Sequence, residues 1–243
     1  MHFPAAKAAL EAGFSVISDK PATATLAEAL ALRDIVAQAS GQYGLTYTYT
    51  GYPMVREARE RIAAGEIGTP RKIVVEYFQG WLAGVPEQQG NKQAAWRVDP
   101  AQAGMGGCIG DIGVHAFQLA EFVAGSTAVA ANPQLDSVVE ARSVDDDCTI
   151  LTRYENGATG YIAASQVAMG ERNGLSIRIY GERGAIAWRQ EQPDRLTIMA
   201  ESGTQTILWA GTSALGQAAT GASRLPSGHP EGYLEAFANL YRD

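Results

Sequence analysis

The stretch HFPAAKAALEAGFSVISDKP, residues 2–21, decides the fold of this 243-residue chain. It predicts a helix from about Phe3 to Ala12, which a glycine ends, and an apolar strand from Phe14 to Ser18. Another helix is predicted from about Leu26 to Ala39. This helix–strand–helix order is typical of the second half of a doubly wound α/β domain with a parallel sheet.

Lys20 and Pro21 follow the predicted strand directly. Ligands of open α/β sheets bind outside the carboxyl ends of the strands. We therefore expect Lys20 to lie at a ligand crevice, with Pro21 fixing the turn beside it.

A second motif, GDIGVH at residues 110–115, opens a helix that is predicted from Asp111 to Val123. Residues four apart lie on one face of a helix, so Asp111 and His115 can point at one small object. Together with Lys20 they supply a carboxylate, an imidazole and an amine. These groups suit a hydroxyl-bearing carbon as that object.

The later part of the chain changes to short segments rich in β-branched and aromatic residues, separated by Gly or Asn. Asn156-Gly157 is a strong hairpin signal. The pattern predicts a mixed, largely antiparallel sheet, covered on one face by the helix from Asp111 and another from Glu231 onward, an α+β arrangement. A flexible loop is predicted from Thr212 to Ser223. The predicted strands are Thr46–Tyr49, Arg71–Gln79, Val138–Arg142, Thr149–Tyr154, Thr159–Ser165, Leu175–Tyr180, Ala185–Trp188 and Arg195–Met199, and a helix is predicted from about Met54 to Ala64.

The composition is that of an ordinary globular protein, with 46% hydrophobic residues and a net charge of −7. No block of lysine or arginine occurs, which disfavours nucleic acid or an anionic membrane as a partner and favours a small neutral or polar substrate. Cys108 and Cys148 are too few for a disulfide framework and lack the spacing of a metal site. With no signal peptide or long apolar run visible, we expect a cytoplasmic setting and no metal.

A dinucleotide-binding fingerprint, Gly-x-Gly-x-x-Gly between a strand and a helix, is missing from the sequence. The glycines from Gly104 to Gly110 have the wrong spacing and no strand before them. Because each βαβ unit takes roughly 30 residues, we expect the chain to be an internal piece of a longer protein. On its own it is expected to expose apolar surface and to bind a cofactor poorly.

Both motifs point to one family. The first fits the pattern A-x-x-A-L-x-A-G-x-x-V-x-x-x-K-P from Ala6 to Pro21, and the second extends from Trp96 to His115 with a glycine run between. In this order they resemble the Gfo/Idh/MocA oxidoreductases, whose usual Glu-Lys-Pro is changed by Asp19 in this chain. The likeness continues through Asp145–Asp147, Asn156–Ala158 and Tyr180–Gly184.

The resemblance implies the C-terminal half of a Rossmann dinucleotide-binding domain in residues 1–50 and an α+β substrate-binding and oligomerisation domain in residues 51–243. It also implies NAD or NADP as the cofactor, and a homodimer or homotetramer formed through the open face of the mixed sheet. The cofactor-binding residues that it implies are Asp19, Lys20, Pro21 and Arg97, and the substrate-binding residues are Lys20, Arg97, Asp111 and His115.

Oxidation of an alcohol carbon needs a proton acceptor, a group that holds the oxygen, and an oxidant at the same carbon. A histidine near its normal pKa is a suitable base at neutral pH, so His115 is the candidate. Lys20 is expected to stabilise negative charge on the oxygen, and Asp111 to orient the sugar hydroxyl or the imidazole. We therefore predict an NAD(P)-dependent dehydrogenase or reductase for a sugar, cyclitol or related polyol.

Each of these residues also has a purely structural explanation. Lys20 can be a surface charge, Asp111 a carboxylate favoured by the helix dipole, and His115 a core histidine. Arg97 either binds a substrate hydroxyl or a cofactor phosphate, or packs beside Trp96 or pairs with the nearby aspartate, residue 99. Two other functions also stay open, an NAD-dependent glycosidase of the same family and a non-catalytic sensor that binds a nucleotide or sugar.

The segment LTYTYTGY, residues 45–52, departs from the family, which commonly shows a glycine, an asparagine and an arginine–aromatic pair there. Substrate contacts from this segment are therefore not the common set. The identity of the substrate does not transfer from the resemblance.

Overall fold

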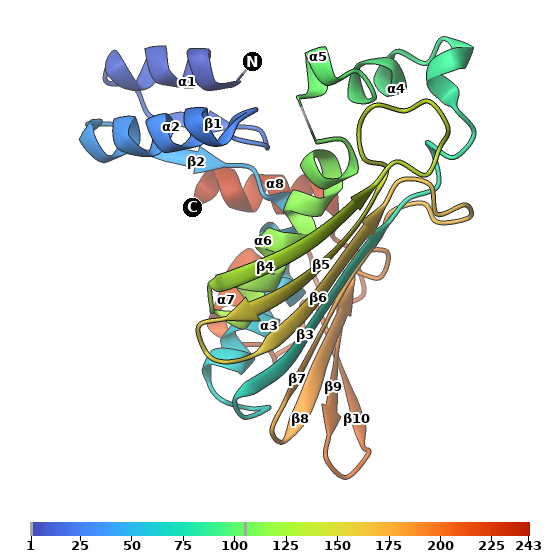
Figure 1. Cartoon of the computed structure of the whole chain (residues 1–243). Helices are drawn as coiled ribbons and strands as arrows, with labels where there is room; N and C mark the ends of the chain where they lie inside the picture. Colours follow the sequence, from blue (N-terminus) through green and yellow to red (C-terminus); the bar gives the residue numbers. More distant parts are fainter. Residues whose placement is uncertain (1, 105) are drawn as a thin grey trace.

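The N-terminal part of the chain folds as a small parallel sheet with two helices (Figure 1). In this computed structural model, which describes residues 2–104 and 106–243, the two strands pair with Val16 opposite Tyr43. Leu10 and Leu32 are buried in a core that belongs to this unit alone. Its elements are α1 (His2–Glu11), β1 (Val16–Ser18), α2 (Leu26–Gln38) and β2 (Tyr43–Leu45).

The sequence predicted α1, β1 and α2 to within two residues of their observed ends. Thr25 caps α2, because its side chain accepts a hydrogen bond from the backbone N–H of Glu28 at 3.2 Å. The unit exposes apolar side chains, as expected, with Phe14 and Leu26 at 67% and 75% exposure.

The strand predicted for Thr46–Tyr49 is wrong. A short 3₁₀ helix, η1 (Thr48–Gly51), stands there instead. The hydroxyl of Thr48 donates to the carbonyl of Thr46, and the hydroxyl of Thr50 donates to the carbonyl of Tyr47. These local bonds offer the backbone an alternative to a β-ladder, which the alternating Thr-Tyr pattern does not reveal.

Eight strands form a second, mixed sheet in the order β10-β9-β8-β7-β3-β6-β5-β4. β3 pairs in parallel with β6, with Lys72 opposite Thr159, and the remaining neighbouring pairs are antiparallel. The predicted mixed sheet is thus confirmed. The strands are β3 (Pro70–Phe78), β4 (Ala128–Asp136), β5 (Asp147–Tyr154), β6 (Thr159–Ser165), β7 (Gly174–Gly181), β8 (Gly184–Arg189), β9 (Arg195–Ala200) and β10 (Gln205–Trp209).

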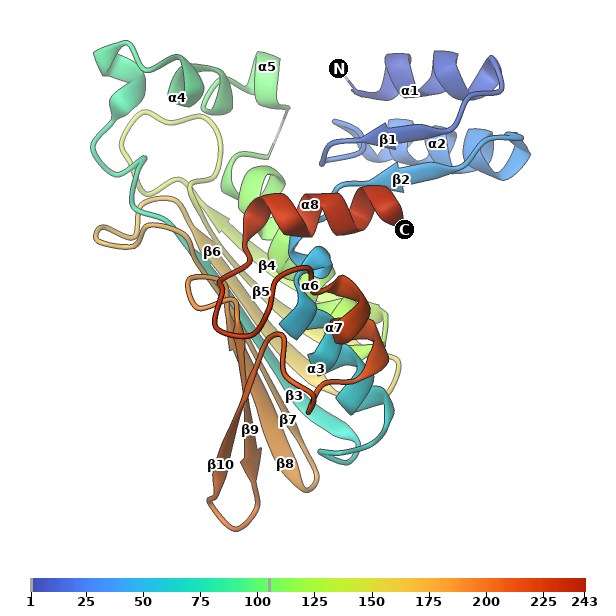
Figure 2. The ribbon, with the colours of Figure 1, turned by 180° about the vertical axis from the view of Figure 1, so that it is seen from behind.

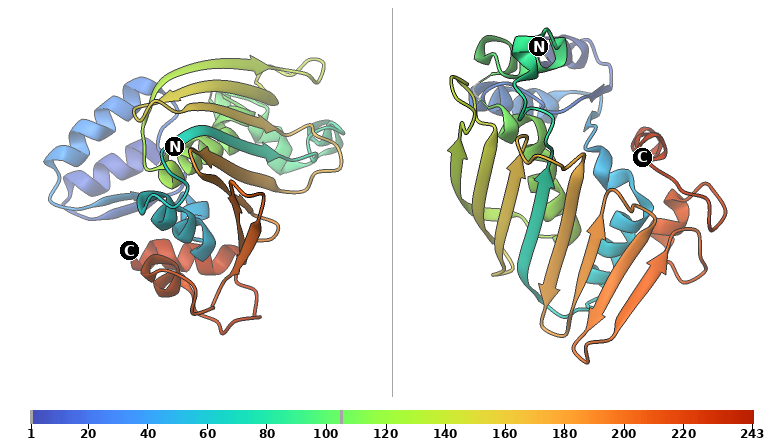
Figure 3. Two further views of the ribbon diagram at one scale, coloured as in Figure 1. Left: turned by 90° about the horizontal axis from the view of Figure 1, so that it is seen from below. Right: turned by 90° about the vertical axis from the view of Figure 1, so that its right-hand side faces the viewer.

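Helices gather on one face of this sheet, as Figure 2 shows from behind. Ile73 and Val75 of β3 and Leu119 of α6 are fully buried between the layers. The two views of Figure 3 show the opposite face free of helices of the described chain. Burial alternates along β5, so Leu151 is half exposed. The covering helices are α3 (Pro53–Ala63), α6 (Val114–Ala124) and α7 (Gln217–Ala222).

The strand predicted for Val138–Arg142 is also wrong. The carboxylate of Asp146 accepts the backbone N–H groups of Val138 and Val139 at 2.7 and 3.0 Å. Because a side chain uses these donors, the segment turns back instead of joining the sheet.

The sequence did not indicate β4, β10 or α7. β4 and β10 are mostly exposed edge strands without clear alternation. α7 lies inside the predicted loop Thr212–Ser223 and is stabilised by tertiary contacts. Glu57 accepts the N–H of Gly216 at 2.8 Å and Glu60 accepts that of Ala218 at 3.0 Å.

The helix predicted from Glu231 onward is α8 (Tyr233–Arg242), which packs against η1. Asn239 is fully buried and donates to the carbonyls of Gly51 and Ala222 at 2.8 and 2.9 Å. A side chain at Gly51 would meet the backbone of Ala236 at 2.1 Å, so this close approach requires glycine. Within the described residues, every helix is too short or too polar to cross a membrane.

Candidate active site

A cavity of about 1070 Å³ opens where several distant segments meet. The residues that follow β1 line it on one side, and Tyr77 near the end of β3 lines it on another. Lys20, Asp111 and His115 all line this cavity, so the structure brings the three together. The chain between β3 and α6 forms η2 (Pro86–Gln89), α4 (Lys92–Arg97), α5 (Pro100–Ala103) and the π-helical turn η3 (Ile109–Gly113). Residues of α4, α5 and η3 contribute to the lining.

Lys20 is held against Asp111. Its Nζ donates to Oδ1 of Asp111 at 2.9 Å and also to the Asp111 backbone carbonyl. An ammonium group has three N–H donors, so one remains for a ligand in the cavity. Asp19 fixes the turn from the other side, since its Oδ1 accepts the backbone N–H of Lys20 and the hydroxyl of Thr46, both at 2.8 Å. Pro21 follows Lys20 on the cavity lining.

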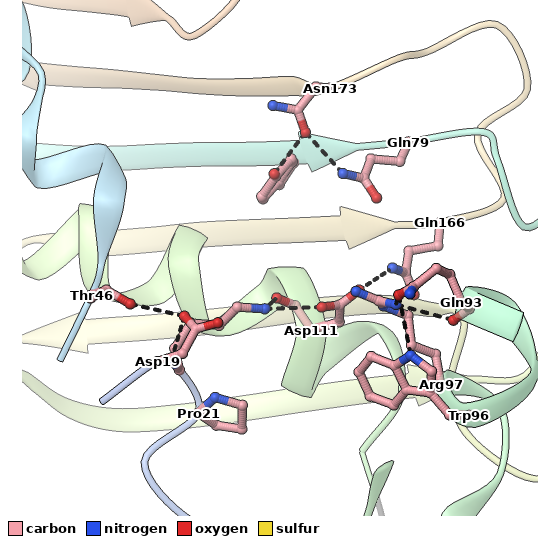
Figure 4. A network of polar contacts seen from close by, with 12 residues as sticks. Asp19, Pro21, Thr46, Gln79, Gln93, Trp96, Arg97, Asp111, Gln166 and Asn173 are labelled. Carbon is pink, nitrogen blue, oxygen red and sulfur yellow. Dashed lines mark hydrogen bonds and ion pairs between the residues drawn. The ribbon is translucent and has the colours of Figure 1, made fainter. Parts of the chain in front are cut away.

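Asp111 stands at the centre of a polar network (Figure 4). Its Oδ2 accepts Nε of Arg97 at 2.9 Å and Nε2 of Gln166 at 2.8 Å. Burial would raise the pKa of Asp111, but the charges of Lys20 and Arg97 outweigh it and hold the pKa below the usual value. The carboxylate is therefore ionised at neutral pH.

Sequence reasoning missed Gln166. It directly follows β6 and is 1% exposed, so its amide is committed to the Asp111 carboxylate. A lone glutamine after a strand carries no motif. Its only sequence signal is its position at the carboxyl end of a strand that runs parallel to its neighbour β3.

The turn that carries Asp111 is built on Asp145. The two carboxylate oxygens of Asp145 accept the N–H groups of Gly107 and Ile109 at 2.7 and 2.6 Å, and its carbonyl accepts that of Cys108 at 2.7 Å. A side chain at Gly107 would lie 2.2 Å from that carbonyl. The predicted regular helix from Asp111 is therefore wrong in its first turn, which is a π turn, a geometry frequent at functional sites. Within the glycine run, Met105 lies outside the described residues.

His115, at the start of α6, is enclosed by aromatic rings. The rings of Tyr49 and Tyr47 meet it edge-on with centroids at 5.0 and 5.9 Å. Its Nδ1 is buried and, among the described residues, has no hydrogen-bond partner. Nε2 is therefore the ring nitrogen that can meet a ligand in the cavity.

The expectation that His115 titrates near its normal pKa is wrong. Burial, together with the nearby ammonium of Lys20, lowers the pKa to about 3, and the opposing effect of Asp111 does not compensate. The imidazole is neutral at pH 7 and so is able to accept a proton. The hydrogen bonds of the Asp111 carboxylate run to Lys20, Arg97 and Gln166, which leaves the imidazole without an orienting bond from it in the part of the chain described here.

Of the alternatives open for Arg97, the structure shows the packing beside Trp96, whereas the predicted ion pair with Asp99 is wrong. Its guanidinium stacks over Trp96 at 4.2 Å from the ring centroid, and the Trp81 ring lies at 5.7 Å. Its ionic partner is Asp111, whereas Asp99 caps α5 by accepting the N–H of Ala101. Arg97 also lines the cavity.

An uncharged set of side chains forms another part of the lining, and sequence reasoning did not identify it. We define the neutral wall as Tyr49, Tyr77, Gln79 and Asn173. Asn173 Oδ1 accepts the hydroxyl of Tyr77 at 2.7 Å and Nε2 of Gln79 at 2.9 Å, and its Nδ2 donates to the hydroxyl of Tyr49 at 3.3 Å. The two hydroxyls lie 2.5 Å apart. Figure 4 shows Asn173 and Gln79 side by side, apart from the row of charged residues.

Comparison with known proteins gives a consistent family assignment. Residues 55–187 match the family model described as the GFO/IDH/MocA C-terminal domain. The "Uncharacterized oxidoreductase YfiI" of Bacillus subtilis is 31% identical over 242 residues, which are 99% of this chain and 62% of that protein. "Levoglucosan dehydrogenase" of Pseudarthrobacter phenanthrenivorans is 28% identical over 82% of this chain and 55% of its own length.

A solved structure agrees. The inositol dehydrogenase homolog from Azotobacter vinelandii, complexed with NAD+, is 35% identical and superposes with a TM-score of 0.94 over 99% of this chain and 62% of that one. The chain thus spans about three fifths of the length of the relatives that it matches.

Proposed function

Because this chain belongs to the Gfo/Idh/MocA family, we propose that the protein carrying it is an NAD(P)-dependent dehydrogenase or reductase. Its substrate is a sugar, cyclitol or related polyol, and the reaction interconverts a hydroxyl and a carbonyl. The relatives named as a levoglucosan dehydrogenase and an inositol dehydrogenase homolog support this substrate class.

The observation that carries the proposal is the meeting of Lys20, Asp111 and His115 in one cavity. Asp111 and His115 lie 91 and 95 residues after Lys20 in the sequence. Because the fold brings residues this far apart into one cavity, an unrelated surface position for each is a poor explanation. The geometry also weakens the purely structural explanation of Asp111 as a helix-dipole carboxylate, since its oxygens bind two cationic side chains.

Lys20 holds the reacting oxygen in this proposal. Its remaining N–H donor hydrogen-bonds the substrate oxygen, and its positive charge stabilises the negative charge that develops on that oxygen. Asp111 keeps the ammonium in place through its carboxylate and its carbonyl. Arg97 and Gln166 in turn hold the carboxylate.

His115 receives the hydroxyl proton at Nε2. A neutral imidazole is required for this step, and the lowered pKa of His115 provides it throughout the neutral range. The positive charge of Lys20 destabilises the imidazolium that forms. The protonated ring is therefore populated only when a negative charge is present in the cavity.

The residues present fit the reactive end of a nicotinamide cofactor, which when bound accepts or donates the hydride. His115 and the remaining N–H donor of Lys20 both lie on the cavity lining, where a bound ligand can contact them. We assign Asp19, Lys20, Pro21 and Arg97 to cofactor contact. All four line the cavity at the carboxyl end of β1 or opposite it.

The wider architecture is proposed on the same basis. Residues 1–50 are the C-terminal half of a dinucleotide-binding domain, and residues 51–243 form the substrate-binding domain. The open face of the large sheet, with half-exposed Leu151, Ile207 and Trp209 on its strands, is the proposed interface of a homodimer or homotetramer. The buried free thiols of Cys108 and Cys148 agree with a cytoplasmic setting.

The test uses the full protein that carries this chain. Purified protein is assayed with NAD+ and NADP+ against a panel of polyols and sugars, and Lys20→Ala is compared with wild type. We expect turnover in wild type and a loss of about 10²–10³-fold in kcat for the variant. Wild-type turnover in Lys20→Ala would end the proposal.

A further inference from the structure

We propose that Arg142 is a positioning residue for the reaction, which acts on Asp111 through Gln166 without touching the substrate. This inference rests on the proposed function and extends it to a charged cluster outside the cavity. Among the described residues that line the cavity, neither Arg142 nor Gln166 occurs. An effect of Arg142 on turnover must therefore pass through the residues between it and the site.

The guanidinium of Arg142 joins two loops that are distant in the sequence. Arg142 lies between β4 and β5, and its side chain is 2% exposed. Its Nε donates to Oε1 of Glu87 at 2.9 Å, and its Nη2 donates to Oε2 at 3.2 Å. Nη2 also donates to the carbonyl of Leu82, and Nη1 donates to Oδ2 of Asp146 at 3.1 Å. Four of the five N–H donors of this guanidinium are thus used within the protein.

Gln166 is held on both sides by residues that Arg142 binds. Its backbone N–H donates to the carbonyl of Asp146 at 2.9 Å, and its own carbonyl accepts the N–H of Leu82 at 3.1 Å. Arg142 in turn binds the carboxylate of Asp146 and the carbonyl of Leu82. The four residues therefore close a ring, in which one guanidinium fixes both hydrogen-bond partners of the Gln166 backbone.

The side chain of Gln166 extends this constraint to the site. Its Nε2 donates to Oδ2 of Asp111 at 2.8 Å, next to the bond from Arg97 (Figure 4). The other oxygen of Asp111 holds the ammonium of Lys20 at 2.9 Å. A shift of the Gln166 backbone would displace its amide from the carboxylate, and hydrogen bonds weaken steeply when they are misaligned. Arg142 therefore helps to position Lys20 through two intervening side chains.

Backbone strain beside Glu87 and Arg142 indicates that their geometry is held firmly. Val85, two residues before Glu87, has a φ of 53°, and Ala141, directly before Arg142, has a φ of 67°. Among the described residues, these two are the non-glycine residues with positive φ. This conformation is unfavourable for a residue with a side chain, above all a β-branched one, and persists only where surrounding contacts fix it. The ion pair between Glu87 and Arg142 supplies such a contact at both turns.

A second arginine offers a matched comparison. Arg61 also binds two carboxylates, those of Glu57 and Glu66, and a backbone carbonyl, that of Ala214. None of these four residues belongs to the cavity lining in the described part of the chain. Arg61 and Arg142 thus have the same kinds of partners, and they differ in their connection to the site.

The experiment is a double-mutant cycle in kcat on the full protein that carries this chain. The substrate is the compound that wild type oxidises fastest in the polyol and sugar panel, with myo-inositol and levoglucosan included. Arg142→Lys keeps the charge, but an ammonium does not reproduce the fork that binds two carboxylates and a carbonyl. We expect kcat to fall about fivefold, with a change of less than about twofold in KM. In a Gln166→Leu background the same substitution should change kcat by less than about twofold, because the side chain that transmits the effect is gone.

Arg61→Lys is the matched control. It removes the same kinds of bonds and is expected to lower the urea midpoint, while kcat keeps the value of its background. Glu87→Gln covers the case in which Arg142→Lys does not fold. It keeps the shape of the side chain and the acceptor for Nε of Arg142 but removes the charge. We expect a loss of about twofold to threefold in kcat, which is again absent beside Gln166→Leu.

Two results overturn the inference while leaving the proposed function intact. One is a wild-type kcat in each of the Arg142→Lys and Glu87→Gln proteins that folds. The other is a loss of kcat that is the same with and without Gln166→Leu, since Arg142 would then act by another route. If wild type turns over no compound of the panel with either cofactor, the proposed function falls and the inference falls with it.

Discussion

The two sides of the cavity hold their side chains in different ways. The charged side, Lys20, Arg97 and Asp111, is joined by short ionic contacts at 2.9 Å. The neutral wall, by contrast, is joined by a directed ring of hydrogen bonds without any charge. Charge acts over several ångströms with little regard to angle, whereas neutral hydrogen bonds weaken steeply when misaligned. The charged side is thus suited to stabilising a reaction, and the neutral wall to recognising a shape.

The largest expected effect comes from the charged side. Asp111→Asn removes the charge that Lys20 and Arg97 share while keeping the shape, and leaves two partly buried cations without a counter-charge. We expect kcat/KM to fall by about 10²–10³-fold and the free energy of unfolding to fall by about 3 kcal/mol. Steady-state kinetics and urea denaturation measure the two losses.

Asp34→Asn is the control for that variant, since Asp34 is exposed on α2 and pairs only with a neighbouring exposed arginine. Both quantities should stay at their wild-type values there. An Asp111→Asn protein with wild-type kinetics would remove the proposed role of the carboxylate.

A second effect concerns His115 and acid. Its pKa in the folded state, about 3, lies below the usual value of about 6.5. Between these two pH values the imidazole of His115 is protonated in the unfolded chain but not in the folded chain. The free energy of unfolding therefore falls as the pH is lowered from 6.5 towards 3. Each pKa unit corresponds to about 1.4 kcal/mol.

His115→Asn should remove much of that slope, whereas His229→Asn, in an exposed loop, should keep it. Thermal unfolding at several pH values from about 4 to about 7 measures the slope. An identical acid dependence in wild type and His115→Asn would show that the ring is not desolvated in this way.

A smaller effect is expected behind the charged side. Gln166→Leu removes one donor from Oδ2 of Asp111 but keeps Arg97 and Lys20 in place. We expect kcat to fall by about tenfold, since a hydrogen bond to a charged group is worth about 1.5–3 kcal/mol. Gln166→Glu should be worse, because it places a second carboxylate against the first. Equal kinetics for Gln166→Leu and wild type would mean that Arg97 alone holds Asp111.

The smallest effect is expected in the neutral wall. Tyr49→Phe deletes one hydroxyl, so Tyr77 loses a donor and Asn173 loses an acceptor. We expect a loss of about 1–2 kcal/mol in the free energy of unfolding and a change of KM larger than that of kcat. Tyr241→Phe, exposed on α8, is the matched control. A kcat loss as large as that of Asp111→Asn would show that Tyr49 contributes to the reaction itself, as the charged side does.

The sequence predicted the charged side better than the neutral wall for a physical reason. Lys20 follows a strand, and Asp111 and His115 share a short motif, so local patterns place each of them. Tyr77 and Asn173 meet because β3 and β7 are antiparallel neighbours with Tyr77 opposite Leu175. That register depends on the whole sheet, and no residue pattern near either side chain signals it.

The fold shows the same division. Helices and strands with strong periodicity were predicted close to their ends, as α2 and β6 illustrate. Errors fell where a side chain replaced a backbone partner, at Asp146 beside Val138 and at Glu57 beside α7. The Glu57 contact joins residues 159 apart in the sequence, and the Asp146 contact depends on one side chain that folds back over a loop, so local propensity contains neither.

The parallel pairing of β3 with β6 has a consequence for folding. Lys72 pairs with Thr159, so the middle of the large sheet closes only after the 86 residues between them have been made (159 − 72 − 1). Contacts of such separation slow folding, because loop-closure entropy precedes any gain from the ladder. During synthesis, β3 therefore has neither of its neighbouring strands, β6 and β7, until well after the turn bearing Asp111 has been made.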